Sequence, residues 1–371
     1  MHWDASVGLS LTSAELPSAR ERLAAELRRA DDPDVHVAAG LLDYVLADFT
    51  AAEAHLRTAF LRYQQSGNRR RAALSAAHLG RVEHDGTGRV SAANGWFSRA
   101  HRLAAAEPRC VEQGWVALNR VGCSFTDAGE LERCARDALD LAADFGDVDL
   151  ECRALADIGL ALVGHGKTTE GMTLLDEAMT MVDSGECANA FISAQVLCCI
   201  VSACERSGDV TRMEALLGAL QVDQPATFRS DARPGLLLVH CESEYGSLLC
   251  GAGRWREAEV ALRRAVRGGE SVHHVARMRA HAALADLRVS QGRLPEAASA
   301  LAGYEDRTET QLPLARLHLA RGDTDLAAAV ARRGIRALSG DVARSAPCSP
   351  PSSRRRSREA RRKRHSTPPP I

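Results

Sequence analysis

Apolar residues recur at helical spacing from about residue 34 to residue 340, and short turns interrupt the pattern at regular intervals. Each turn has a small residue followed mostly by polar or acidic ones, as in Gly253-Arg-Trp-Arg-Glu-Ala258. Adjacent turns are 30 to 45 residues apart, so the chain is a series of repeats, and we predict eight helical hairpins. The eight turn residues are Ala47, Gly88, Gly129, Gly166, Gly208, Gly253, Gly292 and Gly322.

The turn residues suit the chemistry of a helix end. Glycine after an apolar run supplies the left-handed backbone that terminates a helix. Acidic and small polar residues then favour the first turn of the next helix. Pro295 stands in such a first turn, where its missing N–H costs little. We therefore expect each turn to join the two helices of one hairpin.

Small and large residues also stand at fixed distances from the turn residue. In most repeats a small residue lies seven positions before the turn, at Gly40, Gly122, Gly159, Gly246, Ala285 and Ala315. The second repeat has Gly80, one residue further from its turn, and the fifth repeat has Val201 at the seventh position. A leucine lies nine positions after the turn at Leu56, Leu175, Leu262 and Leu301. This spacing predicts two antiparallel helices that approach closely and interlock.

The spacing resembles the tetratricopeptide repeat, in which small residues at these positions face a large one. Phe125, Leu162 and Leu249 occupy the position where that family often has tyrosine. The repeats depart from the family because they lack its helix-ending proline and mostly exceed its usual length. The resemblance implies an all-α fold: a right-handed superhelical solenoid of about eight antiparallel hairpins over residues 34–340.

Three segments resemble the helical-repeat arm of actinobacterial LuxR-type transcription regulators: Leu155–Leu162, Ser202–Asp209 and Leu314–Gly322. Members of that family usually end in a helix-turn-helix domain that binds DNA. Nothing after Gly340 has the pattern of such a domain. The resemblance therefore implies a sensor or interaction arm, and DNA binding cannot be transferred to any residue of this chain.

The two ends differ from the repeats. Residues 1–33 are predicted to hold a leading helix, which Ser18-Ala-Arg-Glu21 opens as a capping box and which ends near Ala30. Residues 341–371 are rich in proline, serine and arginine and carry nine Lys/Arg against two Asp/Glu, so we predict a disordered basic tail. Such a tail could bind nucleic acid nonspecifically, dock on the acidic remainder of the chain, or arise from a frameshift of a longer repeat array.

Composition sets further limits. Alanine, leucine and arginine dominate, and aromatic residues make up 4% of the chain, which favours helices over sheets. The eleven cysteines mostly stand inside apolar helical stretches, where free cysteine behaves as a small hydrophobe. No secretory signal or membrane span is recognisable, so we predict a cytoplasmic protein without a membrane partner.

Motifs that carry chemistry are weak. Gly164-His-Gly-Lys167 resembles the end of a phosphate-binding loop, but Ala161 replaces the required glycine and the preceding pattern is helical. The cysteines at 198, 199 and 204 and the histidines at 273, 274 and 281 lack the second pair of ligands that a metal site needs. We therefore expect no enzyme activity, no cofactor and no metal.

The concave face of a tetratricopeptide array is lined by the first helix of each hairpin. Counting from the small residue before the turn predicts inward-facing side chains at Asn119, Arg153, Gln195, His240, Arg279, Asp286 and Arg316. Mixed polar residues of this kind suit a protein or peptide partner in a concave groove, and a small-molecule effector is a further option. Two interpretations compete: the sensor arm of a truncated LuxR-type regulator, or a stand-alone adaptor scaffold unrelated to transcription.

Overall fold

Helices account for nearly all of the chain that the structure describes. The computed structural model describes residues 16–124, 127–187, 189–222, 236–269 and 274–337. The described elements are α1 (Leu16–Arg29), α2 (Pro33–Val45), α3 (Phe49–Gln65), α4 (Arg69–Val82), the π-helical turn η2 (Glu83–Thr87), α5 (Val90–Ala105), α6 (Val111–Ser124), α7 (Ala128–Phe145), α8 (Val148–Gly164), α9 (Thr168–Asp183), α10 (Ala190–Ser207), α11 (Val210–Val222), α12 (Leu236–Gly251), α13 (Trp255–Gly269), α14 (His274–Ser290), α15 (Leu294–Leu301), the 3-10 turn η4 (Thr308–Thr310), α16 (Gln311–Arg321) and α17 (Thr324–Ala337).

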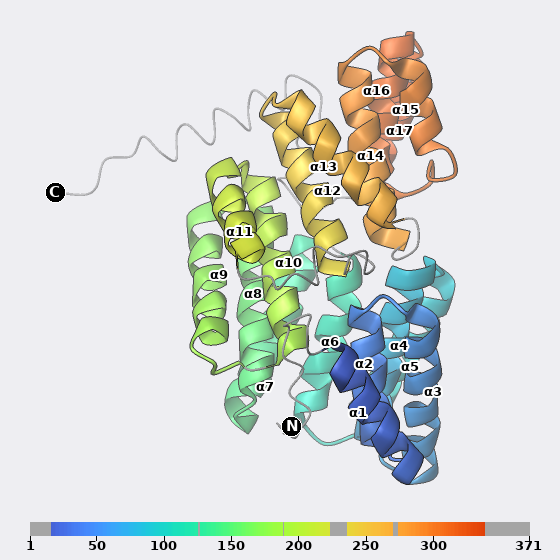
Figure 1. Cartoon of the computed structure of the whole chain (residues 1–371), viewed down its shortest axis with the longest axis vertical. Coiled ribbons are helices and arrows are strands. Elements are labelled where there is room, and N and C mark those ends of the chain that lie inside the picture. Colours follow the sequence, from blue (N-terminus) through green and yellow to red (C-terminus); the bar gives the residue numbers. More distant parts are fainter. Residues whose placement is uncertain (1–15, 125–126, 188, 223–235, 270–273, 338–371) are drawn as a thin grey trace, which may run out of the picture.

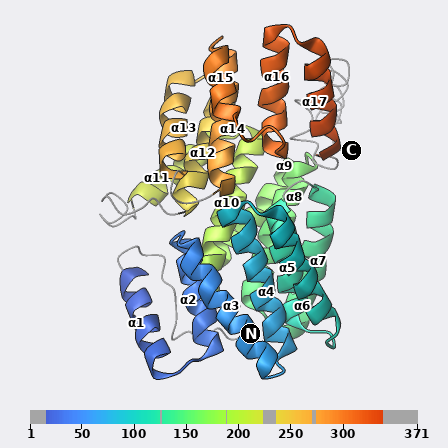
Figure 2. The same cartoon turned by 90° about the vertical axis from the view of Figure 1, so that its right-hand side faces the viewer.

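The helices after α1 pair into eight antiparallel hairpins, from α2/α3 to α16/α17 (Figure 1). Within the described residues no strand occurs. Successive hairpins stack side by side, and the chain coils so that α12–α17 lie above α1–α6 in both views (Figure 2). The predicted all-α solenoid of about eight hairpins is confirmed.

Seven of the eight turn residues adopt the left-handed backbone that the sequence predicted. Gly166, for example, has φ 80° and Gly322 has φ 88°, and Ala47 adopts φ 60° without being glycine. Gly129 is the exception, and its prediction as a turn residue was wrong. It lies inside the first turn of α7, because the Asp127 carboxylate accepts the Gly129 N–H at 2.9 Å and caps the helix.

The predicted interlock of small and large residues is present in several hairpins. A Cβ atom placed on Gly40 would lie 2.7 Å from Leu56 Cγ, and one on Gly246 would lie 2.5 Å from Leu262 Cγ. Real Cβ atoms do not approach other atoms so closely, so only glycine fits at these crossings. The two helices of a hairpin therefore touch where the leucine covers the glycine.

The second hairpin explains why Gly80 stands one residue further from its turn. Gly80 still faces the large residue of its partner helix, since an added Cβ would lie 2.5 Å from Phe97 Cε1. Between Gly80 and Gly88 the backbone forms η2, whose wider π-helical turn takes up an extra residue. The inserted residue shifts the count without moving the glycine out of the crossing.

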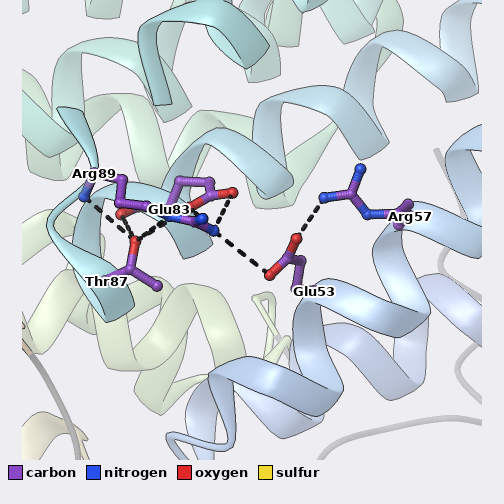
Figure 3. A network of polar contacts seen from close by, with 5 residues as sticks. All are labelled: Glu53, Arg57, Glu83, Thr87 and Arg89. Atoms are coloured by element: carbon purple, nitrogen blue, oxygen red, sulfur yellow. Dashed lines mark hydrogen bonds and ion pairs between the residues drawn. The ribbon is translucent and has the colours of Figure 1, made fainter. Parts of the chain in front are cut away.

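A buried glutamate holds η2 in place. Glu83 is 3% exposed, and Arg89 donates to its carboxylate from Nε at 2.8 Å and from Nη2 at 2.9 Å. Thr87 Oγ1 donates to the Glu83 carbonyl at 2.8 Å, and Arg89 Nη2 also lies 3.9 Å from Glu53 of the preceding hairpin (Figure 3). The contact between Arg89 and Glu53 ties the second hairpin to the first, and Arg57 of the same helix as Glu53 also pairs with that carboxylate.

The same type of link recurs along the array. An acidic residue six positions after one turn pairs with an arginine one position after the next turn. Besides Glu53 and Arg89, the pair Glu214–Arg254 lies at 2.5 Å and the pair Glu259–Arg293 at 3.9 Å. The repeat thus contains an ion pair between hairpins that the sequence analysis missed.

The ends agree with the sequence in part. Helix α1 ends at Arg29, close to the predicted end, and packs on α2 through Ala19 and Leu23. The capping-box prediction was wrong, because α1 already includes Leu16 and Ser18 lies within the helix instead of before it. The predicted basic tail, residues 341–371, lies outside the described residues.

Candidate binding surface on the first helices

The residues predicted to line the concave wall all lie on the first helices of their hairpins, from Asn119 in α6 to Arg316 in α16. Three of them are buried: Asn119 is 5% exposed, Arg153 4% and Gln195 9%. The other four are half-buried: His240, Arg279, Asp286 and Arg316. The structure therefore divides the predicted row into a buried N-terminal group and a partly accessible C-terminal group.

The buried group is satisfied largely from within the chain. Asn119 Nδ2 donates to the Trp115 carbonyl one turn earlier, at 2.9 Å. Arg153 Nε donates to Asp157 Oδ2 at 2.8 Å, and the Asp157 side chain is fully buried. Removing one partner of such a pair would leave an uncompensated charge in the interior. Asn119 and Arg153 therefore serve the fold in this conformation.

Helix α10 also reaches across the interior to the first two hairpins. The ring of Phe191 lies 5.8 Å from the ring of Tyr44 and 6.3 Å from that of His78, both edge-on. The guanidinium group of Arg81 lies over the Phe191 ring at 6.0 Å. Arg81 also donates to the Tyr44 hydroxyl at 3.2 Å, and Tyr44 donates to Asp85. This contact brings the fifth hairpin against the first and second.

The bridge carries a neutral histidine. His78 is 5% exposed, and its burial, with the charge of Arg81 nearby, lowers its pKa to about 3. The imidazole therefore carries no charge at neutral pH. A neutral ring beside Phe191 suits the apolar side of the contact, while Arg81 keeps Asp85 as its ion-pair partner at 3.5 Å.

A second link closes the coil further along. Helix α14 packs against η2, and Arg307 Nη2 lies 3.4 Å from the Gly88 carbonyl. The seventh hairpin thus touches the second. Sequence analysis could not find these contacts, because their partners stand far apart along the chain and no local pattern marks them.

The half-buried group begins with a network across three hairpins. His240 Nε2 lies 3.3 Å from Ser202 Oγ and His240 Nδ1 lies 3.8 Å from Glu244 Oε1. Arg279 Nη1 donates to the same Glu244 oxygen at 2.9 Å. The order Ser–His–carboxylate resembles a nucleophilic triad. Ser202, however, is 3% exposed inside α10, where backbone N–H groups are used by the helix and cannot form an oxyanion hole.

The row ends in an accessible ion pair. Arg316 of α16 donates to Asp286 Oδ2 of α14, and the two side chains are 39% and 25% exposed. Both residues were chosen by the same counting rule, and the structure brings them together. These two side chains are more exposed than those of His240 and Arg279, which are 15% and 11% exposed.

The weaker motifs have structural explanations. Gly166 forms the left-handed turn between α8 and α9, and Lys167 Nζ lies 3.9 Å from Glu170, with a helix before the motif. Burial raises the pKa of the Cys198 thiol to about 12 and that of Cys204 to about 11, so both stay protonated. His281 stacks on Tyr304 at 5.6 Å, while His273 lies outside the described residues.

No group of three or more His, Cys, Asp or Glu side chains within the described part of the chain is arranged to hold a metal ion. No helix there is both long enough and apolar enough to cross a bilayer.

Comparison with known proteins adds little beyond the hairpins themselves. No protein-family model and no curated protein matches the chain. A solved structure of a monomeric IFIT1 mutant with Gppp-AAAA aligns with a TM-score of 0.41 at 16% identity, over 98% of this chain and 90% of that one. The human IFIT1 dimer with m7Gppp-AAAA aligns with a TM-score of 0.42 at 14% identity, over the same shares. Because both TM-scores and both identities are low, the architecture rests on the hairpins of this chain alone.

Proposed function

We propose that this chain is a tetratricopeptide-like binding scaffold, and that it is the sensor or interaction arm of a LuxR-type transcription regulator. The observation that carries the binding role is the Asp286–Arg316 pair, which stands partly exposed on the first helices of the last two hairpins. A neighbouring acid and base offer both a hydrogen-bond acceptor and a forked donor to a polar ligand. A peptide segment fits that chemistry better than an apolar small molecule does.

The proposal includes the absence of catalysis. Ser202, His240 and Glu244 are the arrangement closest to a catalytic one that we found, and Ser202 is buried within a helix. Glu244 is also held by Arg279, which takes up the oxygen that would orient His240. In a scaffold, Ser202, His240, Glu244 and Arg279 instead link α10, α12 and α14.

A charge-swapped variant tests the binding role. Exchanging the two charges, Asp286→Arg with Arg316→Asp, keeps an ion pair between α14 and α16 but reverses what a ligand meets. We expect the full-length chain to lose its partner in affinity capture followed by quantitative mass spectrometry. The matched control is Arg332→Glu, an exposed position on α17 away from the row. An unchanged partner set in the swapped variant would refute the proposed surface.

The regulator assignment rests on the three resembling segments and needs a separate test. Sequencing the locus should reveal a helix-turn-helix coding segment that continues the repeats, in the same or a neighbouring frame. The alternative is a stand-alone adaptor, and a locus without such a segment favours it. Binding to DNA by this chain alone, through its basic residues after Asp341, would be nonspecific and steeply salt-dependent.

A further inference from the structure

Two histidines of the first hairpin point their ring nitrogens at each other. His36 lies in the first turn of α2 and His55 lies in α3, and their Nδ1 atoms are 2.9 Å apart. The ring centroids are 5.1 Å apart with the planes tilted by 43°. At that separation the two nitrogens share a hydrogen bond, in which one ring donates and the other accepts.

Each ring has a carboxylate at its other nitrogen. Asp31 Oδ1 lies 2.9 Å from His36 Nε2, and Asp43 Oδ2 lies 3.8 Å from His55 Nε2. The chain Asp31–His36–His55–Asp43 therefore runs from an exposed carboxylate to one whose side chain is 4% exposed. A carboxylate facing an imidazole nitrogen favours a proton on that nitrogen.

Counting protons fixes the charge of the pair. The hydrogen bond to Asp31 needs a proton on His36 Nε2, and the shared bond needs one between the two Nδ1 atoms. Asp43 lies 3.8 Å from His55 Nε2, beyond hydrogen-bond distance, and its charge favours a third proton there. Three protons on four nitrogens make one neutral imidazole and one imidazolium. We propose that His36 and His55 form a single proton-binding site, which holds one excess proton between Asp31 and Asp43 and thereby clamps α2 to α3.

The surrounding charges agree with a single excess proton. Arg20 of α1 lies 3.0 Å from Asp43 Oδ1 and also pairs with Asp48, while Arg62 of α3 pairs with Asp31. A second proton would place two cations face to face, next to Arg20, and would remove the acceptor from the shared bond. Burial, the charge of His36 and that of Arg20 lower the pKa of His55, in that order.

Acidification therefore adds a second proton and breaks the clamp. Removal of the excess proton at high pH leaves one of the two carboxylates facing an imidazole nitrogen without a proton. Two like charges about 5 Å apart, at the effective dielectric of a protein surface, separate the two protonation steps by about two pH units. Titration of the pair should be coupled, so neither step belongs to one residue alone.

Nuclear magnetic resonance of the full-length chain tests this directly. Labelled ring nitrogens should show a coupling between His36 Nδ1 and His55 Nδ1 at pH 7 that disappears near pH 4. In His55→Gln the ring signals of His36 should change from two steps to one, and in Asp43→Asn the upper step should fall by about one pH unit. The control is His165→Gln, a histidine 3.0 Å from Glu132 without a histidine partner, which should leave both steps unchanged.

Two outcomes would overturn the proposal. One is that the wild-type pair titrates as two independent histidines near pH 6.5, each in a single step. The other is that no coupling between the two Nδ1 atoms appears at any pH between 5 and 8. Both measurements use the wild-type protein, so they stand even if a variant does not fold.

Discussion

Two helical glycines with different surroundings, Gly171 and Gly95, allow a direct test of how closely the helices of a hairpin approach. Gly171 in α9 crosses Gly159 in α8, and a Cβ atom on Gly171 would lie 2.4 Å from the Gly159 carbonyl oxygen. The same atom would lie 2.8 Å from Val163 Cγ2 and 3.0 Å from the Val163 nitrogen. Gly95 in α5 is exposed, and an added Cβ there would meet nothing within 4 Å.

The magnitudes follow from these distances. Relieving the contact in Gly171→Ala requires α8 and α9 to separate by about 1 Å, because the opposing oxygen belongs to the backbone and cannot rotate away. Overpacking of this kind costs roughly 1–3 kcal/mol, and we expect the upper end or beyond, since Val163 and Leu175 are buried at the crossing. Alanine returns at most about 1 kcal/mol of helix propensity. The net loss is about 2 kcal/mol, whereas Gly95→Ala should gain about 0.5–1 kcal/mol.

The assay must resolve single hairpins, because a solenoid can unfold in parts. Amide hydrogen exchange of α8 should become roughly thirtyfold faster in Gly171→Ala and no faster in Gly95→Ala. Urea unfolding followed by circular dichroism should move in opposite directions for the two variants. If Gly171→Ala unfolds at the wild-type urea concentration with unchanged exchange in α8, the helices do not cross at these glycines.

Three further predictions concern pH. Burial raises the pKa of Asp43 to about 6, above its ordinary 3.8, so the stability contributed by its protonated form is lost as the pH rises through 6. Between pH 4 and pH 8, the loss of stability in urea unfolding should therefore be smaller in Asp43→Asn than in the wild type, by about 1–3 kcal/mol. The pKa of His78 is about 3, against an ordinary histidine pKa of 6.5, so the free energy of unfolding should fall by about 3 kcal/mol between pH 7 and pH 4. His78→Gln should remove this pH dependence. The hydrogen bond from Arg288 lowers the pKa of Glu259 to about 2, so the stability that the ionised Glu259 contributes is present above pH 4.5 and lost as the pH falls through 2. Glu259→Gln should cost about 1–2 kcal/mol at pH 7, because it leaves the buried Arg288 without this partner, and a far smaller amount at pH 2.

The hairpins could be predicted from the sequence because their determinants are local. A left-handed turn residue, a glycine before it and a leucine after it lie within about 16 residues, and their physical roles do not depend on the rest of the chain. Gly129 shows the limit of that logic. A neighbouring aspartate, Asp127, caps α7 and draws Gly129 into the helix, so the residue type alone did not decide the backbone conformation.

The glycines between hairpins could have been found by the same reasoning. Gly67 and Gly146 have φ 74° and 67°, and they end α3 and α7. The turns between hairpins are less regular in sequence than the turns within hairpins, so the repeat pattern did not predict them. The Glu53–Arg89 type of pair was missed for another reason: it joins different repeats, so it appears only when the spacing is counted across two turns.

The candidate surface depended on how tightly the array coils, and no local pattern carries that information. The counting rule placed the row on the first helices of the hairpins, yet it could not tell that Phe191 crosses the interior to reach Tyr44 and His78. Nor could it tell that Asn119, Arg153 and Gln195 are buried, at 5%, 4% and 9% exposed.

The closed interior changes where a ligand can bind. In an open superhelix every first helix contributes to one continuous wall. Here α10 contacts the first two hairpins and α14 contacts η2, so some side chains on the inner side of the array contact other hairpins. The Asp286–Arg316 pair, between α14 and α16, stays partly exposed, at 25% and 39% of the two side chains. The proposed partner would therefore contact the last two hairpins, while the first six set the shape that presents them.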